Sequence, residues 1–348
     1  MKGMMKTAVM TGIGKMAFVQ RPIPVPADNE VLVKIEHVGI CGSDLHYFEA
    51  GRIGHYIVEP PFVLGHECSG KVVETGRSVS HLAVGDRVTL EPGKTCGKCA
   101  FCTSGRYNLC PDVIFFATPP IDGVFQEYVA HEAGLCFKLP DQIDSVEGAL
   151  IEPLAVGYHA AKQGNAHAGQ TAVVFGSGCI GLMSMMALKA ENVSRVFVVD
   201  IMQNRLDKAL ELGADAVVNG RNEDAVAAIA RLTDNQGADL VIETAGTDIT
   251  SQQAIHVAKR GSTVVWVGYT ASGMVTLPMG EALDKELNFK TVFRYRNIYP
   301  AAIEAVAAGR VNLKGVVTHT FAFDDIQNAM DRSLSEKATI VKSVVSFR

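Results

Sequence analysis

The pattern of hydrophobic and polar positions changes character near residue 155. Before that point, short apolar runs at 31–35, 70–73 and 87–90 are separated by Gly, Pro and Asp. Such β-branched runs, punctuated by turn residues, predict the strands of an irregular β-rich domain. Beyond residue 155, strand-length apolar runs alternate with amphipathic segments long enough to form helices.

This alternation predicts a parallel sheet covered by helices on both faces. The predicted strands are 171–175, 195–199, 216–218, 239–243, 263–267 and 289–293. The predicted helices between them are 180–191, 203–212, 224–232 and 250–259. After Pro300, the pattern indicates helices at 301–308 and 324–334 and a last strand at 339–345.

Length, charge and cysteine content narrow the class of protein. A chain of 348 residues exceeds the roughly 100–200 residues of one domain, so two domains are expected. A net charge of -5 without blocks of like charge argues against nucleic acid or a charged membrane surface as partner. We expect a cytoplasmic protein, because neither a signal-peptide pattern nor an apolar stretch of about 18 residues is present. Eight cysteines in such a chain indicate metal binding rather than a disulfide framework.

A glycine-rich turn follows the strand predicted at 171–175 and opens the next helix. It reads Gly176-Ser-Gly178-Cys-Ile180-Gly181, which in this strand–turn–helix context predicts a dinucleotide site. Gly176 would permit the tight turn and Gly178 the approach of a pyrophosphate, while Gly181 would let the helix pack closely. A similar turn in a domain that binds no nucleotide is the weaker alternative.

The second predicted strand is followed by a carboxylate, Asp200, 19 residues after Gly181. This is the expected place for a group that binds the adenine ribose hydroxyls. Because a carboxylate repels a 2′-phosphate, the sequence favours NAD over NADP. We expect Arg205 to stack on the adenine or to pair nearby.

Four cysteines, Cys96, Cys99, Cys102 and Cys110, form the pattern C-x2-C-x2-C-x7-C. The segment that contains them is called the cysteine lobe below. Four thiolates at this spacing suit a closed tetrahedral site, which describes a structural zinc. An iron–sulfur cluster is the competing interpretation, but the second cysteine cluster of two-cluster ferredoxins is absent from the sequence. The pattern therefore predicts a metal that stabilises the fold and takes no part in catalysis.

A second set of metal-binding side chains comprises Cys41 and the adjacent pair His66 and Glu67. A catalytic zinc takes three protein ligands and keeps one position open for water or substrate. Taken singly, these residues are ambiguous, because Cys41 serves equally well as a small buried residue and His66 as a loop histidine.

Together these motifs resemble the zinc-dependent medium-chain dehydrogenases. The resemblance covers essentially the whole chain and is strongest to the sorbitol (polyol) dehydrogenase group. It rests on the signature Gly65-His66-Glu67-Cys-Ser-Gly70-x5-Gly76-x2-Val79 and on residues 39–47, 51–54, 150–157 and 292–297.

The resemblance implies an α/β fold with a discontinuous GroES-like β-barrel catalytic domain, residues 1–155 and 296–348. A Rossmann doubly wound parallel-sheet domain, 156–295, is inserted in it, with the active site in the cleft between them. Cys41, His66 and Glu67 would hold the catalytic zinc, and Glu152 would bind it directly or through water. Two zinc ions per chain and a homotetramer are the corresponding expectations.

The resemblance also implies the reaction, in which a secondary alcohol of a polyol such as sorbitol or xylitol is oxidised to a ketose by hydride transfer to NAD. The proton would leave through Glu152, through water on the zinc, or through a relay of Ser43 and His46. The residues implied to contact substrate are Tyr47, Glu152, Arg294 and Tyr295. Those implied to contact the cofactor, besides the glycine turn, Asp200 and Arg205, are Val267, Gly268, Tyr269, Val292, Phe293 and Arg294.

Three rival functions share many of these features. L-threonine 3-dehydrogenase has the same zinc signature, cysteine lobe and NAD, but the segments around Glu152 and Arg294 favour a polyol. A primary-alcohol dehydrogenase is disfavoured by a glutamate rather than a cysteine at position 152. A non-catalytic structural relative would be expected to have lost a zinc ligand, whereas Cys41, His66 and Glu67 are all present.

Overall fold

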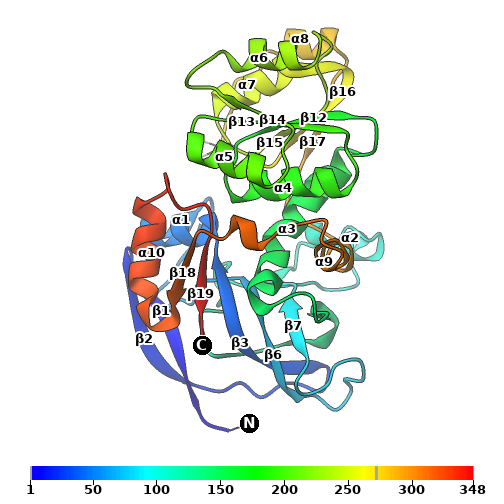
Figure 1. Ribbon diagram of the computed structural model, residues 1–348. Helices are drawn as coiled ribbons and strands as arrows, with labels where there is room; N and C mark the ends of the chain where they lie inside the picture. Colours follow the sequence, from blue (N-terminus) through cyan, green and yellow to red (C-terminus); the bar gives the residue numbers. More distant parts are fainter. Residues whose placement is uncertain (1, 271–272, 348) are drawn as a thin grey trace. The chain divides into compact units, whose positions relative to one another are not determined.

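The computed structural model describes residues 2–270 and 273–347 (Figure 1). Its contacts divide the chain into a first unit, Met1–Glu152 with Val317–Arg348, and a second unit, Pro153–Val316. The division falls next to the boundary predicted at 155 and beyond the one predicted at 295. The predicted α/β fold class, a β-rich domain combined with a parallel-sheet domain, is confirmed.

The first unit is built around β3 (Glu30–Ile40), a long strand that is almost completely buried. Its sheet runs in the order β11 (Cys136–Lys138), β7 (Arg87–Leu90), β6 (Glu67–Thr75), β3, β19 (Ser343–Ser346) and β18 (His319–Ala322), and β10 (Tyr128–Glu132) also pairs with β3. Antiparallel pairing places Gly39 of β3 opposite Glu67, and Ile40 opposite Ser343. The end of the chain is therefore brought beside the start of β6.

Shorter elements complete the first unit. They are the hairpin β1 (Met4–Gly12) and β2 (Lys15–Pro22), the ribbons β4 (Arg52–Ile53) with β5 (Tyr56–Ile57) and β8 (Gly93–Lys94) with β9 (Ile114–Phe115), and helices α1 (Gly42–Ala50), α2 (Ala100–Thr103) and α10 (Ile326–Ser335). The helix α3 (Ser145–Gln163) contains the point at which the chain passes into the second unit. Pro153 lies inside this helix, where it removes one backbone hydrogen bond.

The second unit contains a six-stranded parallel sheet within the described residues. Its strands are ordered β14 (Ala216–Asn219), β13 (Arg195–Asp200), β12 (Thr171–Phe175), β15 (Ala238–Glu243), β16 (Ala258–Trp266) and β17 (Asn288–Thr291). The strand order reverses direction at β12, as in a doubly wound Rossmann sheet. Ligands of such sheets bind at the carboxyl ends of the strands beside this reversal, here β12 and β15.

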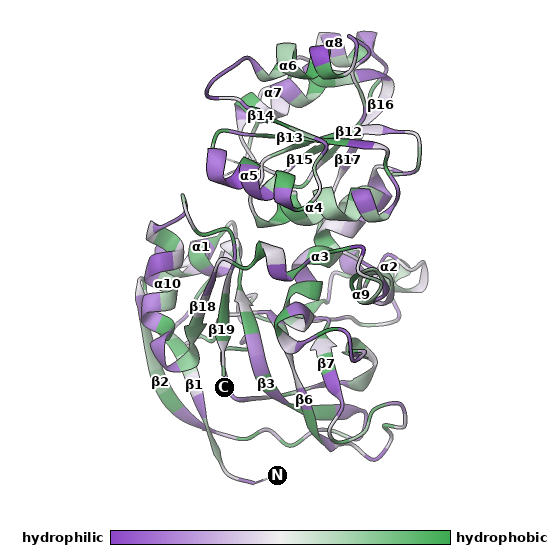
Figure 2. Ribbon diagram, in the orientation of Figure 1, coloured by the Kyte–Doolittle hydropathy of each residue, from purple (hydrophilic) through white to green (hydrophobic). Residues whose placement is uncertain are grey.

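Helices cover both faces of this sheet (Figure 1). On one face lie α4 (Cys179–Ala190) and α5 (Gln203–Glu211), and on the other α6 (Ala225–Leu232) and α7 (Asp248–Val257), which contacts α8 (Met279–Asp284). The predominantly hydrophobic α4 is buried along most of its length, whereas the largely hydrophilic α5 buries only Leu206 and Ala209 (Figure 2). A helix with one narrow apolar stripe covers a sheet and leaves its other side to solvent.

Several predicted elements have different bounds in the structure. The last strand was predicted from residue 339, but Thr339 and Ile340 donate backbone hydrogen bonds to Glu336 O in a turn after α10, and β19 begins only at Ser343. The helix predicted at 250–259 ends at Val257, because β16 already begins at Ala258. The tail after Pro300 otherwise forms α9 (Tyr299–Ala307) and α10, close to the predicted helices. Among the described residues, the helices are too short or too polar to cross a bilayer.

Candidate functional site

Three predicted ligand side chains meet in the first unit. One ligand atom each from Cys41, His66 and Glu67 lies within 4.8 Å of the others. Cys41 is the residue before α1, while His66 and Glu67 stand where the chain enters β6. His66 and Glu67 are buried and Cys41 is partly exposed, so the group has one open side. Thiolate, imidazole and carboxylate around an open position are the donor set of a catalytic zinc.

Asp44, which the sequence analysis did not single out, holds the two ligand segments together. Its Oδ2 accepts a hydrogen bond from Cys41 N at 2.9 Å, and its Oδ1 accepts one from Gly65 N at 2.8 Å. The same Oδ1 lies 3.8 Å from His66 Nδ1. Burial raises the pKa of Asp44, and the nearby His66 opposes this shift. A carboxylate at a ligand histidine fixes the orientation of the ring, and Nε2 is then the nitrogen left for a metal.

The electrostatics of His66 show that this pocket favours a cation. Burial alone would lower the pKa of His66, but the negative charges of Cys41, Asp44 and Glu152 outweigh it and raise the pKa to about 10. The surrounding groups thus stabilise a positive charge at this place, which a divalent cation would supply more fully than a proton. The residues present therefore fit a zinc ion.

The carboxylate of Glu67 lies between Gly39 and Lys342. Gly39 lies opposite it on β3, where a Cβ would overlap Glu67 Oε2. Lys342 Nζ forms an ion pair with the same oxygen and donates a hydrogen bond of 3.0 Å to Ile40 O. Sequence reasoning missed Lys342, because nothing near it in the chain signals its position and only the pairing of β19 with β3 brings it here.

Glu152 lies on α3 and is 5% exposed. It is outside the group formed by Cys41, His66 and Glu67, but its charge raises the pKa of His66. The charge of Glu152 thus acts on His66, one of the three candidate ligands. The direct or water-mediated contact with zinc that the resemblance implies stays a prediction.

The remaining predicted residues of the first unit are on α1. Tyr47 is buried and its ring centroid lies 6.5 Å from that of Phe62. Ser43 is partly exposed and His46 is exposed. Of the two groups named for a proton relay, His46 is therefore the one in contact with solvent.

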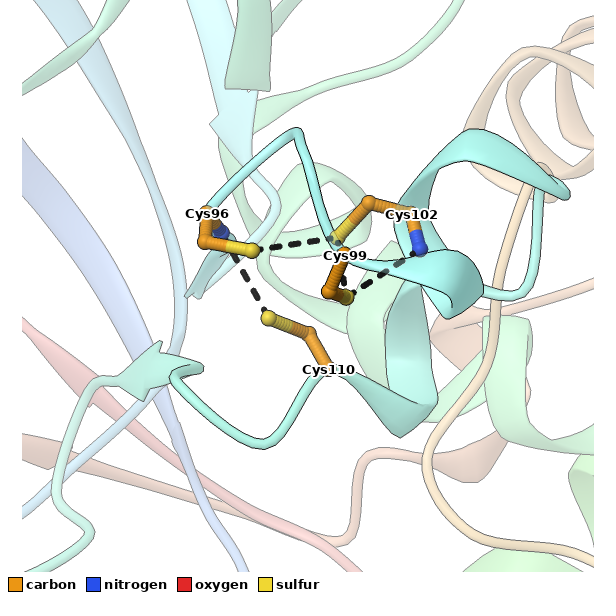
Figure 3. Close-up of side chains that lie close together, drawn as sticks. All are labelled: Cys96, Cys99, Cys102 and Cys110. Atoms are coloured by element: carbon orange, nitrogen blue, oxygen red, sulfur yellow. Dashed lines mark hydrogen bonds between the residues drawn. The ribbon is translucent and has the colours of Figure 1, made fainter.

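The four cysteines of the lobe also come together (Figure 3). The sulfur of Cys102 lies 3.5 Å from that of Cys99 and 3.9 Å from that of Cys96. Zinc–sulfur bonds of 2.3 Å in a tetrahedron separate the sulfurs by about 3.8 Å, so these spacings suit a zinc ion. All eight cysteines of the chain are free thiols.

Backbone amides point at the sulfurs of this lobe. Cys102 N donates to Cys99 Sγ at 3.4 Å, and Cys96 N donates to Cys110 Sγ at 3.5 Å (Figure 3). Hydrogen bonds from the Lys98 and Cys99 backbones lower the pKa of Cys96 to about 7, whereas burial raises the pKa of Cys110 to about 11. Amide donors favour the thiolate form, which is the form that binds metal.

The glycine turn of the second unit has the local geometry that a close-packed nucleotide loop needs. Gly176 has φ 91°, and a Cβ there would come within 2.8 Å of Thr244 Oγ1. A Cβ on Gly181 would overlap Gly176 O, so α4 packs directly against the turn. The N-terminus of α4 carries no side-chain cap at Gly178, and the dipole of a helix N-terminus favours an anion.

Asp200 ends β13 beside this turn. Its carboxylate accepts hydrogen bonds from the backbone N–H of Ser177 at 2.6 Å, Ile201 at 2.7 Å and Met202 at 2.9 Å. Arg205 of α5 reaches toward the same turn, with Nη1 3.9 Å from the Cβ position of Gly178. Arg205 therefore brings a positive charge to the glycine turn itself.

A further carboxylate, Glu243 at the end of β15, organises the neighbouring loops and was not predicted. Its Oε1 accepts hydrogen bonds from Ala245 N and Gly246 N, both at 2.9 Å, and from Thr250 Oγ1 at 2.7 Å. Its backbone oxygen accepts hydrogen bonds from Val267 and Gly268. Two of the predicted cofactor residues are thus fixed to the strand end that borders the sheet reversal, while the adjacent Tyr269 is 74% exposed.

The last predicted residues belong to the segment after β17. Val292 N donates to Trp266 O, and Phe293 is half exposed, with the Arg294 guanidinium 4.8 Å from its ring centroid. Tyr295 is buried, with its ring centroid 5.7 Å from that of Tyr299. These residues belong to the second unit, whereas the candidate metal ligands belong to the first.

Comparison with known proteins matches both halves of the chain. Residues 27–141 match the family described as alcohol dehydrogenase GroES-like domain, and residues 179–308 match the family described as zinc-binding dehydrogenase. A sorbitol dehydrogenase of Bacillus subtilis is 42% identical, over 98% of this chain and 97% of the relative.

Two solved structures are similar over nearly their whole length. One is an Escherichia coli oxidoreductase/dehydrogenase of unknown specificity, with a TM-score of 0.95, 41% identity and coverage of 99% of both chains. The other is a zinc-binding dehydrogenase of Sinorhizobium meliloti bound to NADP, with a TM-score of 0.91, 32% identity and coverage of 99% of both chains.

Proposed function

Since the chain belongs to the zinc-type alcohol dehydrogenases, alongside the sorbitol dehydrogenases, we propose that it oxidises a secondary alcohol of a polyol to a ketose with NAD. The observation that carries this proposal is the group of Cys41, His66 and Glu67, of which His66 and Glu67 are buried, in negatively charged surroundings to which Glu152 contributes. We assign the first unit as the catalytic domain and the second as the nucleotide-binding domain.

In this mechanism Cys41, His66 and Glu67 hold the catalytic zinc. When bound, the zinc supplies Lewis acidity toward a substrate hydroxyl, and NAD supplies the hydride acceptor. Asp44 orients the His66 ring through Nδ1, and Lys342 neutralises one oxygen of Glu67 so that the other is free for the metal.

The proton of the substrate hydroxyl needs an acceptor. We assign this role to the Glu152 carboxylate, because it is buried in the catalytic unit and its charge acts on His66. Ser43 and the exposed His46 are the proposed route to solvent. Tyr47, Arg294 and Tyr295 are proposed substrate contacts, and the forked donors of Arg294 suit neighbouring hydroxyl oxygens.

The preference for NAD rests on Asp200. Three backbone amides hold its carboxylate at the end of β13, where a 2′-phosphate would meet a fixed negative charge. The second zinc of the proposal is the structural ion of the four-cysteine lobe, supported by the sulfur spacing and the amide donors.

We further propose a cytoplasmic homotetramer. Eight free thiols suit a reducing compartment. Within the described residues, strand β17 pairs with β16 alone and is exposed along its length, and Leu283 and Phe293, near it in the chain, are 73% and 50% exposed. The unpaired backbone groups of a strand edge are a template for pairing with another chain. Light scattering coupled to size exclusion would measure the mass of the assembly.

The experiment for the proposed function compares initial rates of NAD reduction with sorbitol, xylitol, L-threonine and ethanol. The proposal expects the highest kcat/KM with one of the two polyols. A highest value with L-threonine would make the chain a threonine dehydrogenase, and one with ethanol a primary-alcohol dehydrogenase. Either result would remove the roles given to Glu152, Arg294 and Tyr295.

A further inference from the structure

The four-cysteine lobe is connected to the rest of the first unit by the two-stranded ribbon of β8 and β9. Within the first unit, strand β8 precedes the lobe and strand β9 follows it, and Gly93 pairs with Phe115 across them. The residues between the strands contain all four lobe cysteines, Cys96, Cys99, Cys102 and Cys110. Phe115 therefore lies on the strand that closes the lobe.

Phe115 packs against a candidate ligand of the other metal group. Its ring centroid lies 5.8 Å from that of His66, with the two planes inclined at 55°. Phe115 is 8% exposed, and the neighbouring Ile114 on the same strand is 47% exposed. Asp44 contacts the His66 ring at Nδ1, and Phe115 contacts it through ring packing, so together they limit how the imidazole can turn.

A second link ties the lobe to the body of the unit at Glu91, just after β7. Tyr107, three residues before Cys110, donates a hydrogen bond of 2.7 Å from its hydroxyl to Glu91 Oε1. His131 Nε2 lies 2.8 Å from Glu91 O, and the His131 ring packs on Phe116, the neighbour of Phe115. Glu91 is 4% exposed. The ribbon is thus held on both sides of the lobe.

We propose that the four-cysteine lobe acts on the catalytic metal group, with Phe115 as the positioning residue that connects them. Metal binding to four thiolates orders the segment that carries them. That order fixes β8 and β9 and keeps Phe115 against His66, which raises the affinity of the Cys41–His66–Glu67 group for its own metal. Because coupling between two binding sites is reciprocal, filling the catalytic group also stabilises the metal in the lobe. This inference rests on the two zinc ions of the proposed function.

The test measures release of zinc from the holoenzyme to a chromogenic chelator. Phe115→Ala is expected to release the catalytic zinc about tenfold faster than the unmodified protein, the loss typical when a partner of a metal ligand is removed. Phe115→Leu is expected to recover part of the slow release. Ile114→Ala, an exposed position on the same strand, is the matched control and should release zinc at the unmodified rate.

Cobalt substitution assigns each metal, because four thiolates and a single thiolate give different visible spectra. In Cys110→Ser, which disrupts the lobe and keeps Phe115, the cobalt of the catalytic group should also be released about tenfold faster. Far-UV circular dichroism checks that each variant is folded. Should Cys110→Ser be unfolded, the lobe metal of Phe115→Ala decides the question, because reciprocal coupling predicts that the lobe of this variant binds its metal about tenfold more weakly, and unchanged binding there overturns the proposal.

An unchanged release rate in Phe115→Ala overturns the coupling. So does a variant in which only KM for the substrate changes, since Phe115 would then contact substrate and not position His66. The proposed function fails separately, if the unmodified protein binds no zinc at Cys41, His66 and Glu67 or none at the lobe.

Discussion

Lys342 and Glu67 form an ion pair whose side chains are only 2% and 1% exposed. The pairing of β19 with β3 brings Lys342 to the start of β6, where it also donates a hydrogen bond to Ile40 O. Two charges taken out of water persist only when each has a partner. The ion pair therefore fixes one oxygen of Glu67 beside the candidate zinc ligands.

Replacing Lys342 with methionine should leave the Glu67 charge buried and unpaired. We expect the zinc-depleted protein to lose about 3–5 kcal/mol of unfolding free energy, the usual cost of breaking a buried pair from one side. Urea unfolding of zinc-depleted Lys342→Met measures this loss. Lys15→Met, on the exposed strand β2, is the control and should change stability by less than about 0.5 kcal/mol. A loss in Lys342→Met as small as that of the control would show that the pair does not hold Glu67.

Gly39 should be equally necessary for the position of Glu67. A Cβ at this position would overlap Glu67 Oε2 and come within 3.1 Å of Lys342 Cε. Gly39→Ala is therefore expected to displace the carboxylate and to yield protein with one zinc per chain, measured by elemental analysis. Gly42→Ala is the matched control, because a Cβ there meets nothing within 4 Å. Two zinc ions per chain in Gly39→Ala would contradict this account of the Glu67 site.

Asp200 should set the choice of cofactor. Asp200→Ser removes the negative charge that a 2′-phosphate would meet, while Arg205 remains near the glycine turn. We expect the ratio of kcat/KM for NADP to that for NAD to rise about tenfold or more, equivalent to about 1.4 kcal/mol. Steady-state kinetics with both cofactors measure the ratio, and Asp207→Ser on α5 serves as control. An unchanged ratio would remove the role of Asp200 in selecting NAD.

His159 on α3 should make stability depend on pH. Burial, with the charges of Arg296 and Lys162, lowers its pKa from 6.5 to about 4. The unfolded chain therefore binds the extra proton between about pH 4 and 6.5, so stability is full above 6.5 and falls as the pH drops through this window. Between pH 7 and 5, His159 alone should contribute about 2 kcal/mol to the loss of unfolding free energy. Urea unfolding of His159→Gln should show a smaller loss, and an identical loss would mean that His159 does not titrate in this way.

Local sequence signals predicted the parts of the structure that depend on neighbours in the chain. The strand at Thr171–Phe175, the glycine turn and α4 follow one another directly, and the structure has them close to the predicted bounds. The grouping of the four lobe cysteines was also predictable, because they are close together in the sequence and the short segment between them folds back on itself.

Two contacts that depend on long-range pairing were not predicted. Lys342 reaches Glu67 only through the sheet register, and Phe115 reaches His66 only through the β8–β9 ribbon. Asp44 and Glu243 were missed for another reason. In the sequence, Asp44 has the position of a helix-capping residue and Glu243 has that of a strand end. Only the positions of the backbone amides around them show that each residue holds two loops together.

The most direct test of a catalytic zinc at Cys41, His66 and Glu67 is to follow polyol-dependent NAD reduction while zinc is removed by a chelator and then restored. We expect activity with sorbitol or xylitol to fall with loss of the first zinc per chain and to return when zinc is added back. Cys41→Ser should retain only the lobe zinc and show no activity. Full activity in zinc-free protein, or in Cys41→Ser, would contradict the assignment.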